Sequence, residues 1–268
     1  MKWLRSFLLF AGIALLLLNI TGLFKSLRNE DLNKEITPYK NDISIPLSEA
    51  RVQLNCMQNE TDKDFAVRVT MVINHAMAHY WKDEGIKSYH MQVPLWENYI
   101  LSIKQRISGE KKYEFRNYKK VIERGVGICS QPCIALKYLL NANDIKAELW
   151  DIWGHVVVEA EFSDGTKYIL DPDYGNYVPH SMEYIQSHLD VVRESYKNQD
   201  SVYADHYKDH RSTEDIVNIY EKDRNHIYYM PKSFEDFSYI AIWILPILLI
   251  IPYACAFFKK NKSLLHKN

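Results

Sequence analysis

The chain has 268 residues, of which 47% are hydrophobic and 25% charged, an ordinary globular composition with apolar segments added. Its formal net charge of −1 argues against a nucleic-acid-binding protein, which needs a strongly basic surface. The four cysteines have no evident pairing, so the sequence predicts no disulfide framework.

An apolar run near the N-terminus covers residues 7–24 and is interrupted only by Asn19 and Thr21. It is long enough to span a bilayer core of about 30 Å. A cleaved signal peptide is the alternative interpretation, but no small-residue cleavage site follows the run. We therefore predict an uncleaved transmembrane anchor within residues 1–28, followed by an irregular stalk at 29–60.

A second apolar run covers residues 239–258 without a single charge and predicts a transmembrane helix despite Pro246 and Pro252. Four lysines follow the run, and the positive-inside rule places such a tail in the cytoplasm. Two spans return the N-terminus to the same side. The sequence thus predicts a two-pass protein of the cytoplasmic (inner) membrane, with an extracytoplasmic domain at 61–235 and the second span with its tail at 236–268.

Thr61 and Asp64 form a variant of the capping box, which predicts a helix whose apolar stripe runs on to Tyr80. His75 and His79 lie four residues apart on this predicted helix, which is a spacing of metal ligands. No acidic residue of an H-E-x-x-H motif accompanies them, so we interpret the pair as a surface or packing feature.

A second histidine pair, His206 and His210, lies in the polar stretch 197–215, with an aspartate before each histidine. Metal binding is the alternative, but short acidic-histidine pairs are common without metal, and a polar flap is the preferred interpretation. We therefore expect neither a metal nor a cofactor.

Two further helices are predicted. Ser181 is a suitable N-cap for a helix that reaches Tyr196. Pro94 suits the first turn of a helix that Gly109 ends, and its apolar residues share one side: Leu95, Tyr99, Ile103 and Ile107.

The residues that suggest chemistry lie between Gly125 and Gly175. Gly125 and Gly127 form a turn that opens into an apolar helix, which places Cys129 at the helix N-terminus. The unpaired N–H groups and the helix dipole favour a thiolate there. Cys129 is therefore a candidate nucleophile.

A β-hairpin follows, with strands at 155–162 and 166–170 joined by a Ser-Asp-Gly turn. His155 opens the first strand and Asp171 closes the second, so antiparallel pairing brings the two side chains to one end of the hairpin. There His155 would take the proton of Cys129 while Asp171 holds the imidazole in the required tautomer.

Three segments, Gly127-Ile-Cys129, Gly154-His-Val-Val-Val-Glu159 and Leu170-Asp-Pro172, resemble the transglutaminase-like superfamily. The resemblance covers the central third of the chain. It implies an α+β, papain-like domain, with the catalytic cysteine at a helix N-terminus packed on an antiparallel sheet. It also implies thiol acyl transfer, amide hydrolysis or peptidolysis through a thioester. One departure concerns the acceptor pocket, because valines follow His155 where the family often has an aromatic residue.

Acyl transfer also needs a second oxyanion donor beside the backbone N–H of the nucleophile. Transglutaminase-like and papain-like enzymes resemble one another in drawing this donor from upstream of the cysteine. Gln92, Trp96 and Asn98 are the candidates, and the alternative is that each is a loop or core residue.

Structural roles remain the alternative for the whole site. Cys129 alone would suit a small buried hydrophobe, and Cys133, one helical turn later, suits core packing. The expected function is acyl transfer on a protein, peptide or glycan-linked amide in the cell envelope. The alternative function is an inactive transglutaminase-like binding or scaffold module of an envelope or polysaccharide assembly.

Overall fold

The computed structural model describes residues 2–29, 43–80, 82–197, 212–222, 224–227 and 232–265. The chain divides into two compact units. The sheet unit comprises Leu27–Met91 and Glu114–Met230, and the helical unit comprises Met1–Ser26, Gln92–Tyr113 and Pro231–Asn268. Residues 92–113, which the sequence analysis placed within the 61–235 domain, thus group with the two apolar segments. The pair His206 and His210 lies outside the described residues.

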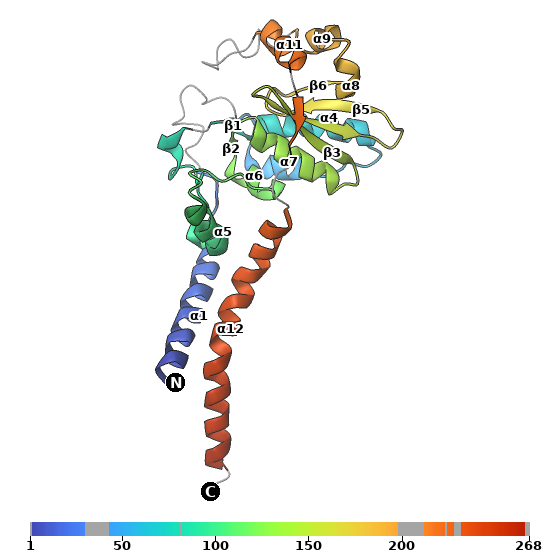
Figure 1. Cartoon of the computed structure of the whole chain (residues 1–268). Helices are drawn as coiled ribbons and strands as arrows, with labels where there is room; N and C mark the ends of the chain where they lie inside the picture. Colours follow the sequence, from blue (N-terminus) through green and yellow to red (C-terminus); the bar gives the residue numbers. More distant parts are fainter. Residues whose placement is uncertain are drawn as a thin grey trace. The chain divides into compact units, whose positions relative to one another are not determined.

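The sheet unit is a mixed α+β structure built on a five-stranded antiparallel sheet, which confirms the predicted class and the predicted hairpin (Figure 1). The strand order is β6-β5-β4-β3-β7. The strand bounds are β3 Lys146–Ile152, β4 Val156–Glu161, β5 Lys167–Asp171, β6 Asn176–Val178 and β7 Arg224–His226.

Helices cover both faces of this sheet. On one face α7 (Ser130–Asn141) contacts β3 and β4, and α4 (Asp62–Ala76) contacts β5 and β6. On the other face Val157 and Ile169, which point to one side by strand alternation, join a buried cluster with three helices. These helices are α8 (Met182–Ile185), α9 (Asp190–Tyr196) and α11 (Thr213–Glu221).

Two helix predictions need correction. The helix that Ser181 caps ends at Ile185, and a separate helix, α9, carries Tyr196. The helix that Thr61 caps ends at Ala76, because Met77 is extended and the next two residues form β1 (Ala78–His79). Strand β1 pairs in parallel with β2 (Val126–Gly127), so backbone pairing overrides the helical pattern there.

Three shorter helices complete the described part of the sheet unit: α3 (Leu47–Gln53), η1 (Asp83–Gly85) and α6 (Tyr118–Arg124). Helix α3 lies in the segment that was predicted to be an irregular stalk. It packs on α4, whose Arg68 donates to the carbonyl of Gln53 at the end of α3.

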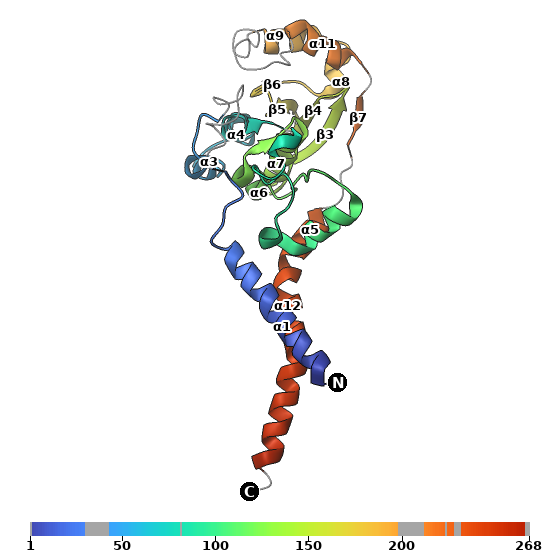
Figure 2. The ribbon, with the colours of Figure 1, turned by 90° about the vertical axis from the view of Figure 1, so that its left-hand side faces the viewer.

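The helical unit contains α1 (Lys2–Gly22), α5 (Leu95–Ser108) and α12 (Lys232–Leu265) (Figure 2). Helices α1 and α12 are long and apolar enough to cross a membrane. They run antiparallel, because Asn19 contacts Ile242 whereas Gly12, earlier in α1, lies against Pro246 and Ile250, later in α12. A Cβ at Gly12 would come within 2.7 Å of the Pro246 carbonyl oxygen, so glycine permits this close approach.

A proline explains how the three helices join. Pro246 has no N–H, so the carbonyl of Ile242, four residues earlier, lacks its donor within α12. Asn19 of α1 donates its side-chain amide to that oxygen at 2.6 Å, and the Tyr99 hydroxyl of α5 donates at 3.0 Å. One carbonyl therefore ties α1 and α5 to α12.

Candidate active site

Cys129 occupies the N-cap position of α7, two residues after the end of β2, which confirms its predicted place at a helix N-terminus. Its side chain is half-buried. Gly127 is required two residues earlier, because a Cβ there would lie 2.4 Å from the Cβ of Gln131. The glycine lets the first turn of α7 fold closely against β2.

Gln131 fixes that first turn. Its side-chain oxygen accepts the N–H of Phe115 at 3.0 Å and the guanidinium of Arg124 at 2.5 Å, and its amide donates to the Phe115 carbonyl at 2.9 Å. Gln131 and Arg124 are fully buried. Because buried polar groups are costly to leave without partners, these bonds specify one position for the turn that carries Cys129.

The hairpin brings His155 and Asp171 together as the sequence predicted. Val158 pairs with Leu170, so Asp171 falls opposite Val157, and His155 shares the face of Val157 by strand alternation. The His155 Nε2 donates to the Asp171 Oδ2 at 2.8 Å. Both side chains are buried.

Asp171 accepts four hydrogen bonds, which hold its carboxylate in place. Its Oδ1 accepts the backbone N–H groups of Asp173 and Tyr174, both at 3.1 Å. Its Oδ2 accepts from His155 and from the Tyr196 hydroxyl, the latter at 2.8 Å. The carboxylate thus builds the turn that follows it while it orients the imidazole.

The electrostatics of the site favour a charged imidazole. Burial alone would lower the pKa of His155, but the Asp171 carboxylate and a hydrogen bond with Cys129 raise this pKa well above its usual value. Burial, with the nearby Asp171 charge, raises the pKa of Tyr196 well above its usual value. Tyr196 is therefore a neutral donor to Asp171.

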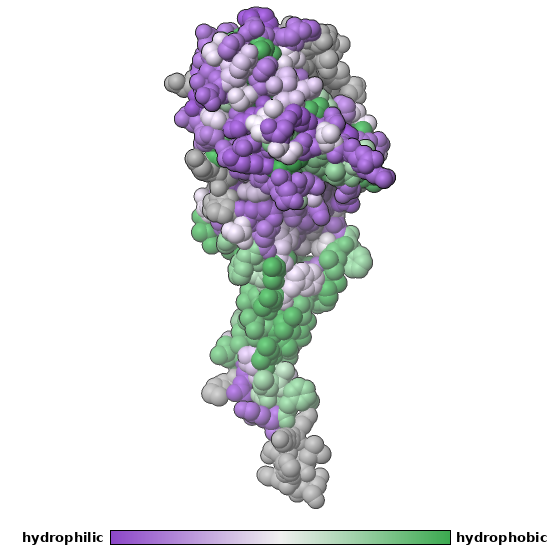
Figure 3. All heavy atoms as spheres, turned by 90° about the vertical axis from the view of Figure 1, so that its right-hand side faces the viewer, coloured by the Kyte–Doolittle hydropathy of each residue, from purple (hydrophilic) through white to green (hydrophobic). Residues whose placement is uncertain are grey.

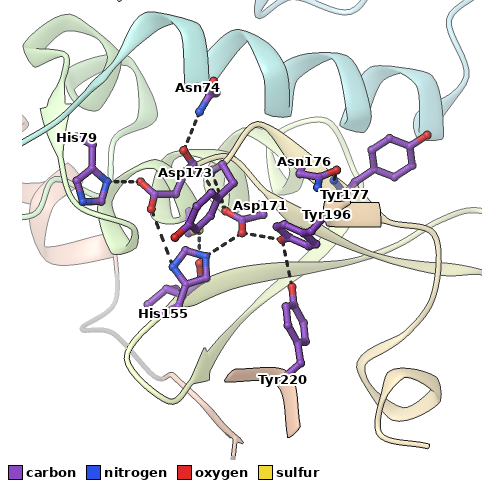
Figure 4. A network of polar contacts seen from close by, with 12 residues as sticks. Asn74, His79, His155, Asp171, Asp173, Asn176, Tyr177, Tyr196 and Tyr220 are labelled. Atoms are coloured by element: carbon purple, nitrogen blue, oxygen red, sulfur yellow. Dashed lines mark hydrogen bonds and ion pairs between the residues drawn. The ribbon is translucent and has the colours of Figure 1, made fainter. Parts of the chain in front are cut away.

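Sequence reasoning missed a second carboxylate near His155, that of Asp173, and its hydrogen bond with His79 (Figure 4). One oxygen of Asp173 accepts from the His79 Nδ1 at 2.6 Å, and the other lies 4.0 Å from the His155 Nδ1. His79 is on β1, where it pairs with Gly127, two residues before Cys129. Asn74 donates to the Asp173 carbonyl at 2.7 Å and fixes this loop on α4.

His75 and His79 do not share a helical face, so the prediction that both lie on one helix was wrong. His75 is exposed in the last turn of α4, whereas His79 lies beyond the helix on β1. The Asp-Pro-Asp sequence at 171–173 was the only signal for the second carboxylate. The pairing of β1 with β2 has no signal that a pattern search detects, since each strand contributes two residues.

Cys133 has a structural environment. Its side chain is fully buried, and its thiol donates to the Val156 carbonyl at 3.0 Å. Burial, together with the negative charge of Asp171, raises the pKa of the Cys133 thiol well above its usual value. A protonated, enclosed thiol agrees with the core-packing interpretation.

The three oxyanion candidates belong to the helical unit, whereas the catalytic candidates belong to the sheet unit. Gln92 is exposed, and Trp96 lies under the ammonium of Lys25 at 5.6 Å. Asn98 is buried and donates to the Ser238 hydroxyl at 2.9 Å. The role of these three residues stays a prediction.

Comparison with protein-family models, with curated proteins and with solved structures found no match to this chain.

Proposed function

We propose that the chain is a transglutaminase-like, papain-like enzyme that transfers or hydrolyses acyl groups through a Cys129 thioester. The observation that carries the proposal is the His155–Asp171 contact of 2.8 Å through Nε2. Because Asp171 occupies Nε2, the proton that moves during the reaction is on Nδ1, next to Cys129. A nucleophile, a base and a residue that orients the base is the arrangement of thiol acyl transferases.

In the first half-reaction the Cys129 thiolate attacks the carbonyl carbon of an amide. The His155 Nδ1 then gives its proton to the amide nitrogen, the C–N bond breaks, and an amine leaves with a thioester behind it. In the second half-reaction water or an amine attacks the thioester and gives a proton to Nδ1. The C–S bond breaks, and thiolate and imidazolium are restored.

In this cycle the Asp173 carboxylate stabilises the charged imidazole of His155. Its carboxylate lies 4.0 Å from the His155 Nδ1, which is the nitrogen that exchanges the proton. A negative charge on that side stabilises the imidazolium that is paired with the thiolate before the first half-reaction and again after the second. The bond from His79 at 2.6 Å holds the carboxylate in this position. Asp173 and His79 are thus proposed positioning residues, with Asp171 as the main orienting group.

The substrate class we propose is an amide of a protein, a peptide or a glycan-linked peptide in the cell envelope. The proposed topology places α1 and α12 across the cytoplasmic membrane, with both chain ends in the cytoplasm. The antiparallel contact of α1 and α12 supports it, because the end of α1 and the beginning of α12 then emerge on one membrane side. The connecting residues would lie outside the cytoplasm.

The test compares thiols within the full chain in detergent. Iodoacetamide should alkylate Cys129 faster than Cys56, which is exposed but has no His155 beside it. The variant His155→Gln should reduce the alkylation rate of Cys129 to that of Cys56 and leave Cys56 unchanged. Equal, slow alkylation of both thiols in the wild type would refute an activated nucleophile and favour the scaffold module.

A further inference from the structure

Helix α5 of the helical unit buries several polar side chains and exposes two isoleucines near its end. Asn98, Ser102 and Gln105 are at most 2% exposed, although each carries a polar side chain. Ile103 is 49% exposed and Ile107, one turn further, is 82% exposed. Ile103 and Ile107 of the stripe that the sequence predicts therefore point away from the protein, whereas Tyr99 of the same predicted stripe is buried, contrary to that prediction.

Two of these buried polar side chains, those of Asn98 and Gln105, bond within the helical unit. Asn98 donates to the Ser238 hydroxyl at 2.9 Å. The Gln105 oxygen accepts the N–H of Val93 at 2.9 Å, and its amide donates to the Glu110 carbonyl at 3.1 Å. These bonds satisfy the inward face of α5, so this packing is specific. An apolar outward face on such a helix needs an apolar medium.

Contacts of α5 place it near the end of α1 and near the beginning of the apolar part of α12. The Tyr239 hydroxyl near the start of α12 donates to Glu97 at 2.7 Å. The Lys25 ammonium, just past the end of α1, lies 5.6 Å from the Trp96 ring. Tryptophan, tyrosine and lysine are the residues that mark a membrane interface. Figure 3 shows apolar side chains over the helices of this unit.

We propose that α5 lies in the interfacial layer of the bilayer, with Leu95, Ile103 and Ile107 in the boundary between headgroups and acyl chains. The occupant of its outward face is lipid. Arg106, exposed beside these residues, suits lipid phosphate groups, as in other interfacial helices. The helix would be a third membrane contact, additional to the two spans. This inference rests on the membrane part of the proposed function.

The test uses the full chain in nanodiscs of phosphatidylcholine and phosphatidylglycerol. The background variant is Cys56→Ser, Cys129→Ala and Cys255→Ser, which leaves only the buried Cys133. Ile107→Cys labelled with the fluorophore NBD is compared with Ser108→Cys, an exposed position about 100° around the same helix. Ile103→Cys is the second outward position, in case one label disturbs the helix.

NBD at positions 103 and 107 should emit at shorter wavelength than at Ser108. Lipids with a doxyl group near the headgroup should quench it roughly threefold more than at Ser108. Quenching by aqueous iodide that is equal at all three positions would overturn the proposal. A blue shift without lipid quenching would also overturn it, because the face would then be covered by protein, such as a second copy of the chain.

A separate measurement distinguishes failure of this inference from failure of the proposed topology. Alkaline carbonate should leave the full chain in the membrane fraction if α1 and α12 span the bilayer. Release of the chain by carbonate would refute the spans and α5 insertion together. Retention of the chain with water-exposed NBD at positions 103 and 107 would refute only the interfacial placement of α5.

Discussion

Replacing Asp171 by asparagine is the sharpest test of the site, because it changes charge with almost no change in shape. The backbone N–H groups of Asp173 and Tyr174 can still bond to the amide oxygen. The new amide nitrogen would then face His155 and the Tyr196 hydroxyl, both of which donate to Asp171 in the wild type. To avoid two opposed donors, His155 must take the other tautomer, with its proton on Nδ1 and no acceptor for the thiol.

The size of the effect follows from the buried charge pair. Opposite charges about 4 Å apart attract each other by about 4 kcal/mol at an effective dielectric constant near 20. The 2.8 Å contact between His155 and Asp171 is at least that close. Since each 1.36 kcal/mol is one pKa unit, Asp171→Asn should lower the ratio of imidazolium to neutral imidazole roughly a thousandfold at a given pH.

The assay is alkylation of Cys129 by iodoacetamide in the full chain, with the exposed Cys56 as an internal reference. We expect at least a ~10-fold slower reaction at Cys129 near pH 6, because the thiolate has lost the cation beside it. The matched control is Asp164→Asn, which changes an exposed carboxylate at the turn of the same hairpin. If Cys129 of the Asp171→Asn variant is alkylated at the wild-type rate, Asp171 serves only the turn that follows it, and the triad is refuted.

Three further predictions follow from other features. The difference in melting temperature between the wild type and His155→Gln should be largest below about pH 6.5. It should shrink as the pH rises through the raised pKa of His155, because the folded chain then loses the proton that it binds more tightly than the unfolded chain. Asn19→Leu should weaken the α1–α12 pair by about 0.6 to 1.7 kcal/mol in a detergent unfolding assay. Thr21→Ala should have little effect, since the Thr21 hydroxyl donates to the Leu17 carbonyl within α1. Alkaline phosphatase fused after Lys232 should be active and after Lys262 inactive, and the reverse pattern would place Cys129 in the cytoplasm.

The catalytic candidates were predictable because their signals are local. A glycine turn before a helix fixes the place of Cys129, and a hairpin with a tight turn fixes the register between His155 and Asp171. His79 was misplaced because the apolar pattern of α4 continues past Ala76. The chain leaves the helix to pair with β2, and that partner lies about fifty residues later, where no window of the sequence reveals it.

Helix α5 illustrates a different limit. The sequence predicted its start after Pro94, its end at Gly109 and its apolar stripe, and the structure has a helix with these ends that is kinked at Asn98, where φ is −161° and ψ is 100°. Periodicity identifies which residues share a face, but not which medium that face meets. The outward direction of Ile103 and Ile107 depends on the partners of Asn98 and Gln105, which are set by tertiary contacts.

The Ile242 carbonyl also bears on the order in which the chain matures. Asn19 is made more than two hundred residues before its acceptor, so in the proposed topology its amide would enter the bilayer with α1 before the Ile242 carbonyl is made. Closure of the helix pair is then a late event that depends on the last part of the chain. A chain truncated before Ile242 would lack the acceptor of the Asn19 amide, and a chain that lost α1 would have one donor fewer at Ile242. Helix α1 therefore stabilises α12 through a hydrogen bond, and cleavage of α1 as a leader would remove that bond.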